Sequence, residues 1–355
     1  MEVLYVNLFS VYIFSYFARY FSIQDLSNIT RVKAEKLLVL ISGTILIIVS
    51  GLRNNIGDTV FYIHSYEKEN FTWESVMKGK DAGFGVYQML LKQFSDDPQI
   101  LIFVSAFITN LLIVMVLYKY SRLLEISLYV FITSGMFLVS MNGMRQFLAA
   151  AILFAGTKLL EKRKWLPYFL VVLLASAFHQ SALIMILVYF LVNRKAWTKG
   201  TFMLLAAAVL IVIGFSQFQT LLFNALENTQ YEGYKNFSEG GANFLRVVVN
   251  AVPLAIAYFG RDRLKEINPN SDLIINMTLL GFIFMIISTQ NWIFARFSIY
   301  FGLYNLILVS WIIKVFRKKD EKLIYYSLLI CYFIFFYYEE VLSLNMYYSS
   351  DYIKL

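Results

Sequence analysis

The chain has few of the residues on which soluble domains and disulfide-rich proteins depend. Only 15% of its 355 residues are charged, whereas an ordinary soluble domain is nearer a quarter charged. Its single cysteine, Cys331, lies within an apolar run. This excludes an internal disulfide and a thiol metal site, and we expect Cys331 to be a buried small hydrophobic residue. There is no Walker A motif or soluble nucleotide-binding domain, so the energy for any reaction should come from an activated substrate.

Apolar sequence, in contrast, is abundant. Hydrophobic residues make up 59% of the chain, and the mean hydropathy is +0.63. Apolar runs of near-spanning length recur throughout, whereas a membrane barrel would show short alternating strands. The sequence therefore predicts an all-α, polytopic transmembrane helical bundle that forms a single domain over residues 1–355. About twelve membrane segments are expected, at residues 3–21, 37–50, 99–118, 123–140, 144–160, 165–178, 181–192, 200–218, 244–260, 272–290, 293–313 and 322–338. The first lacks a basic region and a cleavage site, so we expect a retained helix rather than a signal peptide.

Basic residues cluster in short loops between these segments, which explains the net charge of +8 without nucleic acid as a partner. The positive-inside rule makes these loops cytoplasmic, and it places both termini and two long loops, 51–98 and 219–243, outside. In the first long loop Phe84, Tyr87, Leu91 and Phe94 share one face at helical spacing, which predicts an amphipathic helix in the membrane interface. The basic clusters are Arg31, Lys33 and Lys36; Lys119 and Arg122; Lys158, Lys162, Arg163 and Lys164; Arg194, Lys195 and Lys199; Arg261, Arg263 and Lys265; and Lys314, Arg317, Lys318, Lys319 and Lys322.

This topology depends on the apolar stretch 165–192. If it were one long helix, Arg194, Lys195 and Lys199 would lie outside, against the positive-inside rule. Two short helices that meet near His179 keep this cluster inside and place the polar break near the outer face. We expect this broken hairpin, and because irregular backbone at membrane depth must face protein or a wet cavity, the break itself indicates a site.

Arginines are the strongest candidates for function. Arg53, Arg145 and Arg296 each lie at the end of an apolar stretch, where a charge is costly unless it has a role. The hairpin topology brings all three to the outer side, although each could instead be a snorkelling side chain at a helix end. Arg246 is expected in the first turn of the segment 244–260. Gln146 lies next to Arg145 at the start of the apolar segment 144–160.

Three titratable residues accompany the arginines at the predicted outer face. His179 lies at the helix break, but a lone histidine in an apolar run is often a satisfied structural group. Asp58 is a candidate base or a salt-bridge partner for an arginine, and Asp81, in DAGFG, is a loop acid that could contact substrate. A histidine at such a place could accept a proton from a sugar hydroxyl.

Guanidinium groups suit one narrow chemistry. They stay charged and bind phosphate oxygens in a bidentate manner, so several together would hold a pyrophosphate and stabilise it as it leaves. The outer segments contain no cluster of carboxylates or histidines at metal-ligand spacing. The residues therefore predict a pyrophosphate-handling site that needs no metal and no cofactor.

The same residues carry a resemblance to a known family. The chain resembles the EpsG family, the Wzy-type polymerases of exopolysaccharide, capsule and O-antigen repeat units. The matching landmarks are GLRNNIGDTVFY, the acidic residue Asp81 before an aromatic–glycine pair, MRQFLAAAI, AFHQSALI and ARFSIYF, in the order of the family over about residues 50–301. Asp81 stands where the family often has a glutamate, and the usual proline of that loop is absent.

The resemblance implies a GT-C-like membrane glycosyltransferase in the bacterial cytoplasmic membrane, acting on its outer side on undecaprenyl-pyrophosphate-linked oligosaccharides. The growing chain would move onto a new repeat unit, with release of undecaprenyl pyrophosphate. Arg53, Arg145 and Arg296 would hold the pyrophosphate, and His179 or Asp58 would be the base. We expect a separate chain-length regulator protein as a partner, besides membrane lipid.

Two other classes remain open on the sequence alone. A flippase for lipid-linked oligosaccharides would need cations along a path through both leaflets, but the inner halves of the segments are almost free of charge and no inverted repeat is visible. An O-antigen ligase would share the arginines and the histidine and differ only in its acceptor, and His179 does not strongly exclude an acyltransferase.

Overall fold

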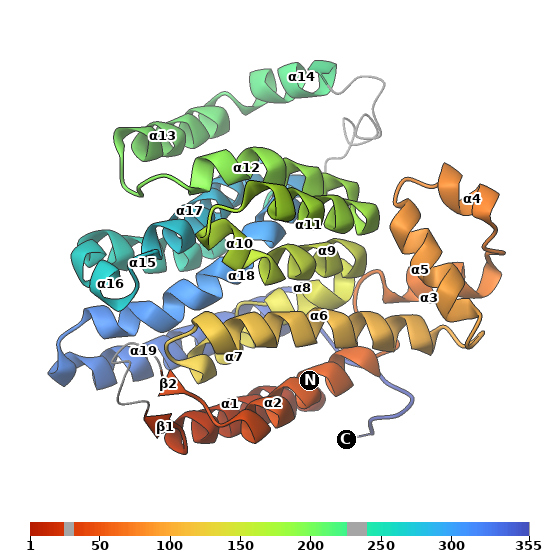
Figure 1. Cartoon of the computed structure of the whole chain (residues 1–355), viewed down its shortest axis with the longest axis horizontal. Helices are drawn as coiled ribbons and strands as arrows, with labels where there is room; N and C mark the ends of the chain where they lie inside the picture. The colour runs from red at the N-terminus through yellow and green to blue at the C-terminus, as the bar shows by residue number, and fades with distance from the viewer. Residues whose placement is uncertain (25–31, 226–239, 355) are drawn as a thin grey trace.

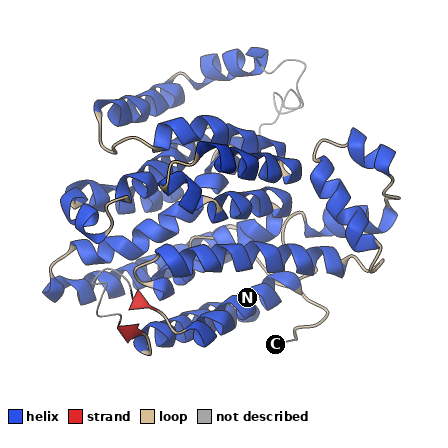
Figure 2. Ribbon diagram, in the orientation of Figure 1, coloured by secondary structure: helices blue, strands red, loops and turns tan. Residues whose placement is uncertain are grey.

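The computed structural model describes residues 1–24, 32–225 and 240–354, and these form a bundle of helices (Figures 1 and 2). The only strands among the described residues are the two-residue pair β1 (Ile23–Gln24) and β2 (Val32–Lys33). The bundle helices are α1 (Glu2–Tyr20), α2 (Lys36–Gly51), α6 (Gln99–Tyr120), α7 (Leu124–Thr133), α8 (Met136–Asn142), α9 (Met144–Ala155), α10 (Thr157–Glu161), α11 (Trp165–Phe178), α12 (Ile184–Val192), α13 (Lys199–Ile213), α14 (Phe215–Ala225), α15 (Phe244–Phe259), α16 (Arg261–Ile267), α17 (Ser271–Ser288), α18 (Ile293–Ile312) and α19 (Lys318–Phe336). The 3-10 turn η1 (Gln180–Leu183) precedes α12, a second one (Ile313–Val315) follows α18, and a π-helical turn (Tyr337–Ser343) ends α19.

Each predicted apolar segment is helical, but the expected number of membrane crossings is not confirmed. Among the described residues four helices are long and apolar enough to cross a membrane, or up to seven if each strongly bent pair counts as one span. Four further apolar helices are shorter, among them α2 and α9. Periodicity and hydropathy identify apolar helices but not where a helix bends or stops short, so the expected number of about twelve spans stays a prediction.

The bundle has two chemically different ends. At one end, here called the basic end, Trp311 Nε1 donates to the Tyr120 carbonyl at 2.8 Å, and Asn270 Nδ2 donates to Glu161 Oε1 at 3.0 Å. These contacts join the loops that carry the basic clusters. The opposite end, here called the loop end, contains the three short helices α3 (Thr59–Lys68), α4 (Trp73–Lys78) and α5 (Ala82–Lys92), on the right in Figure 1, and the C-terminal segment 344–354.

The predicted hairpin within 165–192 is confirmed. Helix α11 ends at Phe178, and η1 and α12 return the chain to its starting level. The Tyr189 hydroxyl donates to the Arg163 carbonyl at 2.9 Å, and the Tyr168 and Tyr189 rings lie 5.8 Å apart. The end of α12 is therefore beside the start of α11, and His179 lies at the loop end.

Helices α7 and α18 form the centre of the bundle. Every residue of α7 is buried, as is nearly all of the C-terminal half of α18. Ser127 Oγ of α7 donates to the Leu306 carbonyl of α18 at 2.8 Å. Between membrane helices, close packing and such interhelical hydrogen bonds supply the stability that apolar burial supplies in water.

Two expectations are corrected by the structure, and a third falls partly outside the described residues. The predicted interfacial helix exists as α5, but its apolar face packs on protein: Phe84 is 3% exposed, and the Tyr87 ring lies 6.0 Å from that of Phe178. Phe94 lies beyond the helix and is exposed. Cys331 is exposed on α19 rather than buried. In the second long loop, residues 219–225 belong to α14, whereas residues 226–239 lie outside the described residues, as does Arg31.

Candidate functional site

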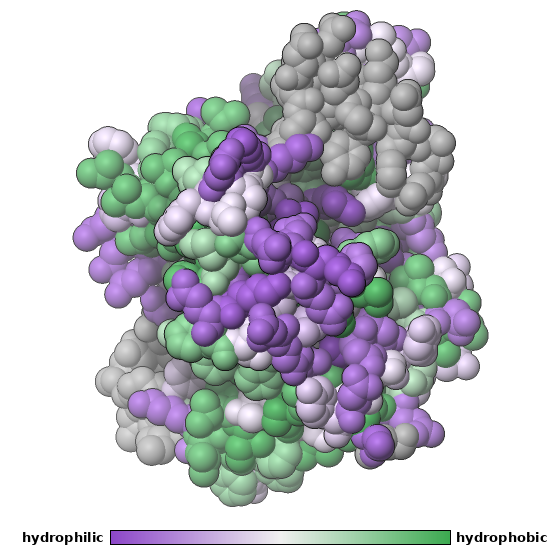
Figure 3. Space-filling view, turned by 90° about the vertical axis from the view of Figure 1, so that its right-hand side faces the viewer, coloured by the Kyte–Doolittle hydropathy of each residue, from purple (hydrophilic) through white to green (hydrophobic). Residues whose placement is uncertain are grey.

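The loop end presents a hydrophilic area, with hydrophobic surface on both sides of it and below it (Figure 3). Helices α3, α4 and α5 cover part of this end, anchored by a small apolar cluster. A cavity of about 550 Å³ lies between these helices and the start of α9, within the usual size of a ligand pocket. The anchoring cluster consists of Tyr66, Phe84, Leu101, Ile102 and Met144.

Arg53 organises the loop that leads into this site but does not line the cavity. Its guanidinium is 1% exposed. Nε donates to Thr59 Oγ1 at 3.0 Å, one terminal nitrogen donates to the Met141 carbonyl at 2.7 Å, and the other to the Ser50 carbonyl. The structure therefore does not bring Arg53 into the cavity with Arg145, and its contacts connect α2 to α8 and α3.

The geometry of the loop explains the second glycine of the GLRNNIGD motif. Gly57 has φ +53°, in the left-handed region where a side chain is strained. A Cβ at this position would lie 2.1 Å from Asn142 Oδ1. That oxygen accepts the Asp58 backbone N–H at 3.0 Å, which positions Asp58 at the start of α3 and beside the cavity.

The two asparagines of the same motif bind the C-terminal segment. The Asn54 N–H donates to the Ser349 carbonyl at 3.0 Å, and Asn55 Nδ2 donates to the Tyr347 carbonyl at 2.9 Å. Ser349 N–H returns a bond to Asn55 Oδ1 at 2.8 Å. The motif therefore has a structural role, because it joins the end of α2 to α8 and to the C-terminal segment.

The centre of the site is Asp81, which connects the hairpin to α9. Asp81 Oδ2 lies 3.0 Å from a terminal nitrogen of Arg145 and 3.4 Å from His179 Nδ1. Asp81 Oδ1 accepts the Gln180 backbone N–H at 3.1 Å. Its side chain is 8% exposed, whereas that of Arg145 is 42% exposed and can still reach a ligand.

A second glycine makes this arrangement possible. A Cβ at Gly83 would lie 2.6 Å from Ala177 Cβ and 2.7 Å from the Ala177 carbonyl. Only glycine lets the start of α5 approach the end of α11 so closely, and this approach brings Asp81 to His179. The DAGFG sequence, a weak signal by itself, therefore has a packing role.

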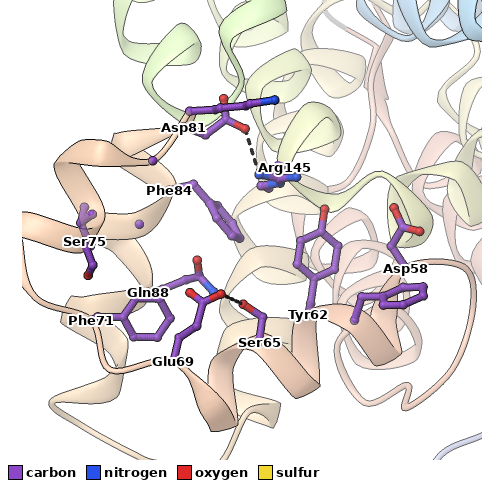
Figure 4. Close-up of a pocket in the computed structure, with 15 residues that line it drawn as sticks. Asp58, Tyr62, Ser65, Glu69, Phe71, Ser75, Asp81, Phe84, Gln88 and Arg145 are labelled. Atoms are coloured by element: carbon purple, nitrogen blue, oxygen red, sulfur yellow. Dashed lines mark hydrogen bonds and ion pairs between the residues drawn. The ribbon is translucent and has the colours of Figure 1, made fainter. Parts of the chain in front are cut away.

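Aromatic rings complete the surroundings of Arg145. Its guanidinium carbon lies 5.9 Å from the centre of the Tyr62 ring and 5.8 Å from that of Phe84. Figure 4 shows Arg145 above these two rings, with Asp81 on one side and Asp58 on the other. The cavity wall also offers hydroxyl, amide and carboxylate groups, from Ser65, Glu69, Ser75 and Gln88.

Arg296 lies in the first turn of α18, next to the first turn of α9. Gln146 Nε2 donates to the Arg296 carbonyl at 2.7 Å, so the starts of α9 and α18 are joined next to Arg145. The Arg296 guanidinium stacks 4.7 Å from the Trp292 ring. Gln146 is 5% exposed, so its contact with Arg296 is structural in this arrangement. Ser181 joins the hairpin tip to α18 through its hydroxyl, 2.7 Å from that of Tyr300.

Arg246 has a different partner from the other arginines. Two of its nitrogens lie 2.6 and 2.7 Å from Glu339 Oε1, in the π-helical turn after α19. Glu339 is 3% exposed, so the Arg246 charge compensates a buried carboxylate. The structure does not place Arg246 among the residues that line the cavity.

The electrostatics of the site keep Asp81 ionised. Burial alone would raise the pKa of Asp81, but the His179 hydrogen bond and charge, together with Arg145, hold this pKa below its usual value. Asp81 Oδ2, 3.4 Å away, can accept an N–H from His179 Nδ1. In the neutral tautomer that carries this N–H, the Nε2 lone pair is the proton acceptor. No group of three or more potential metal ligands occurs within the ranges that the structure describes.

Sequence reasoning missed Tyr62 and Glu69 in this site. Tyr62 lies four residues after Asp58, so helical spacing from Asp58 could have indicated it. Glu69 is the residue that follows α3, and its carboxylate accepts a hydrogen bond from the Ser65 hydroxyl at 2.9 Å. Nothing in the local sequence distinguishes it from an ordinary surface acid.

Comparison with known proteins gives one family. No curated protein and no solved structure matches the chain. The model of the EpsG family matches residues 36–352, which include every element of the site described above. The chain therefore belongs to the EpsG family, the family of Wzy-type, exopolysaccharide polymerase-like proteins.

Proposed function

We propose that this protein is a metal-independent membrane glycosyltransferase that polymerises undecaprenyl-pyrophosphate-linked oligosaccharide repeat units. Its family supports a membrane protein of polysaccharide biosynthesis. The observation that carries the proposal is the contact of Asp81 with both Arg145 and His179, beside a cavity with aromatic and hydroxyl-bearing walls. Arg145, a cation for phosphate, lines this sugar-sized cavity, and His179 does not line it but contacts Asp81, which does.

In the proposed reaction the growing chain is the donor and an incoming repeat unit is the acceptor. The acceptor hydroxyl oxygen bonds to the anomeric carbon of the chain as the bond from that carbon to the pyrophosphate oxygen breaks. The hydroxyl proton moves to His179 Nε2, and undecaprenyl pyrophosphate leaves with its negative charge facing Arg145. The charge on Arg145 is fixed, so the cation needs no metal to stabilise the leaving group.

Each remaining residue receives a role that follows from its contacts. Arg296 is proposed as a second pyrophosphate contact, because Gln146 joins its helix to that of Arg145. Asp81 positions Arg145 and His179 and carries no proton itself. Asp58 lies beside the same cavity and is the alternative base. Arg53 and Arg246 support the site through α2 and the π-helical turn rather than by touching the phosphate.

The proposal also includes an orientation in the membrane. The described basic clusters lie at the basic end, and the positive-inside rule makes this end cytoplasmic. The loop end with its cavity then faces the exterior of the cytoplasmic membrane, where activated lipid-linked repeat units would be consumed. A chain-length regulator that docks at the loop end is part of the same proposal.

A reconstituted reaction tests the function. Purified full-length protein is incubated with a lipid-linked repeat unit in EDTA without nucleotide, and products are separated by length. We expect a ladder of lengths from the wild type and from Arg263→Ala, an exposed arginine at the basic end, but none from folded Arg145→Ala. Folded wild type that leaves the correct repeat unit unchanged would refute the proposal.

A further inference from the structure

A second cavity lies at the basic end, far along the bundle from the candidate active site. It measures about 380 Å³. Its walls come from the loop before α13, from the bend between α15 and α16, and from the start of α17. Helix α16 turns by 85° from α15, so it leaves the direction of the bundle at this level.

Four charged side chains line this cavity without pairing with one another. Arg261 and Lys265 lie one helical turn apart on α16, and Asp262 and Asp272 are the two carboxylates. In the described part of the chain no ion pair joins any of these four residues to another. Asp272 Oδ1 accepts the Ala196 N–H at 3.2 Å, and the Arg261 guanidinium lies over the Tyr258 ring at 5.3 Å. The two cations and two carboxylates of this cavity are therefore available to bind a ligand.

Two aromatic side chains, Trp197 and Tyr258, also line the cavity, and Phe202 packs behind Tyr258. The Trp197 and Tyr258 rings meet edge to face at 5.1 Å, and the Phe202 and Tyr258 rings lie 6.0 Å apart. Trp197 has φ +59°, a rare conformation for so large a side chain. Tryptophan and tyrosine are enriched at the level of lipid headgroups, where one side of the ring is apolar and the other wet.

The surface next to this cavity is apolar. Phe259, directly before the bend, is 85% exposed, and Phe202 and Met203 on α13 are also exposed. In a membrane protein such side chains face acyl chains. The change from exposed phenylalanine to the charged residues of α16 occurs within two positions, so the cavity lies where acyl chains give way to headgroups.

We infer that this cavity binds the phosphoethanolamine headgroup of a membrane phospholipid. Arg261 and Lys265 bind the phosphodiester, and Asp262 and Asp272 accept hydrogen bonds from the primary ammonium group. The balance of charges selects a zwitterion, because a purely anionic headgroup would face two uncompensated carboxylates. A choline headgroup has no N–H to donate to them. This site is independent of the function proposed for the loop end.

The test measures binding of defined lipids to detergent-purified, full-length protein by native mass spectrometry. Phosphatidylethanolamine, phosphatidylcholine and phosphatidylglycerol with the same acyl chains are compared, and inorganic phosphate and soluble phosphoethanolamine are added as competitors. We expect phosphatidylethanolamine to bind about tenfold more tightly than the other two lipids, the value of one charge-assisted hydrogen bond. The double variant Arg261→Ala/Lys265→Ala should lose this preference, and Asp262→Asn should reduce it.

Arg263→Ala is the matched control, since Arg263 lies on the same helix, does not line the cavity and pairs with Glu266. This variant should bind all three lipids as the wild type does. Soluble phosphoethanolamine should compete, and inorganic phosphate should not. Equal affinity for the three lipids, an unchanged preference in folded Arg261→Ala/Lys265→Ala, or inorganic phosphate that competes as well as phosphoethanolamine would each overturn the inference.

Discussion

Replacing Asp81 with asparagine keeps the shape of the side chain and removes only its charge and one acceptor. The amide oxygen introduced by Asp81→Asn could still accept the Gln180 N–H, which Asp81 accepts at 3.1 Å. The amide nitrogen, however, would face two donors, Arg145 at 3.0 Å and His179 at 3.4 Å. Arg145 would lose its charge partner. His179 could keep its contact only as the tautomer whose Nδ1 accepts the amide N–H, and the Nε2 of that tautomer carries a proton and cannot act as the base.

The size of the effect follows from these contacts. A hydrogen bond to a charged group contributes about 1.5–3 kcal/mol, and the 42% exposure of the Arg145 side chain reduces its share by solvent screening. We take ~1.5–3 kcal/mol for both contacts together, which corresponds to a loss of about 10–100-fold in kcat/KM. The protein should still fold, because the apolar cluster under α5 is untouched.

The assay compares rates of chain extension for the wild type, Asp81→Asn and Asp96→Asn. Asp96 is an exposed acid of the same loop region, so its variant controls for the loss of one negative charge. Fluorescence-detected gel filtration confirms folding of each variant. If folded Asp81→Asn extends chains at the rate of the wild type, the positioning role of Asp81 is refuted.

The lowered pKa of Asp81 sets the pH range over which its contacts stay unchanged. The pKa of Asp81 is lower in the folded state than in the unfolded state. The stability that its ionised carboxylate contributes is therefore fully present above the unfolded-state pKa, and it is lost only as the pH falls through the lowered value. Between roughly pH 5 and 8 Asp81 therefore stays ionised. A loss of activity in this range must therefore come from a group other than Asp81, and a pH profile of chain extension checks this.

Three further predictions concern His179, Arg53 and Gly57. His179→Gln should reduce the rate of extension by about 100-fold or more while substrate binding is retained; a rate like that of the wild type would move the base to Asp58. Arg53→Ala should lower the free energy of unfolding by ~3 kcal/mol, since it leaves the Ser50 and Met141 carbonyls unpaired, and melting curves should distinguish it from folded, inactive Arg145→Ala. Gly57→Ala should destabilise the protein by about 2 kcal/mol or more, because a Cβ at φ +53° would lie 2.1 Å from Asn142 Oδ1. Gly143→Ala, whose Cβ would meet nothing closer than 3.7 Å, should melt as the wild type does.

The positions of helices and of the hairpin were accessible from the sequence because they depend on local patterns. The apolar stretch 165–192 contained one polar break, and the charge at 194–199 required the chain to reverse there, as the structure confirms. The number of complete membrane crossings was not accessible. Bends such as the 57° angle between α7 and α8 depend on single residues, here Gly135 at φ +78°, that hydropathy does not register.

For the arginines, too, the sequence identified the candidates, but only the structure showed what each one contacts. Their sequence context marked Arg53, Arg145, Arg246 and Arg296 as similar, costly charges at helix ends. The structure gives each a different environment: Arg53 is buried among carbonyls, Arg246 binds Glu339, Arg296 stacks on Trp292, and Arg145 lines the cavity. The roles of Tyr62 and Gly83 depend on residues that are remote in the chain, Arg145 for Tyr62 and Ala177 for Gly83.

By itself the sequence determined the class of protein, the helical segments, the loops that carry positive charge and the reversal at His179, because hydropathy and loop charge act within one segment at a time. Only the tertiary structure decided which charges meet. Asp81 lies 64 residues from Arg145 and 98 from His179, and their contact requires the close approach of α5 to α11 over Gly83. An ion pair depends on the distance between its atoms, and that distance is set by packing between segments that no local pattern relates.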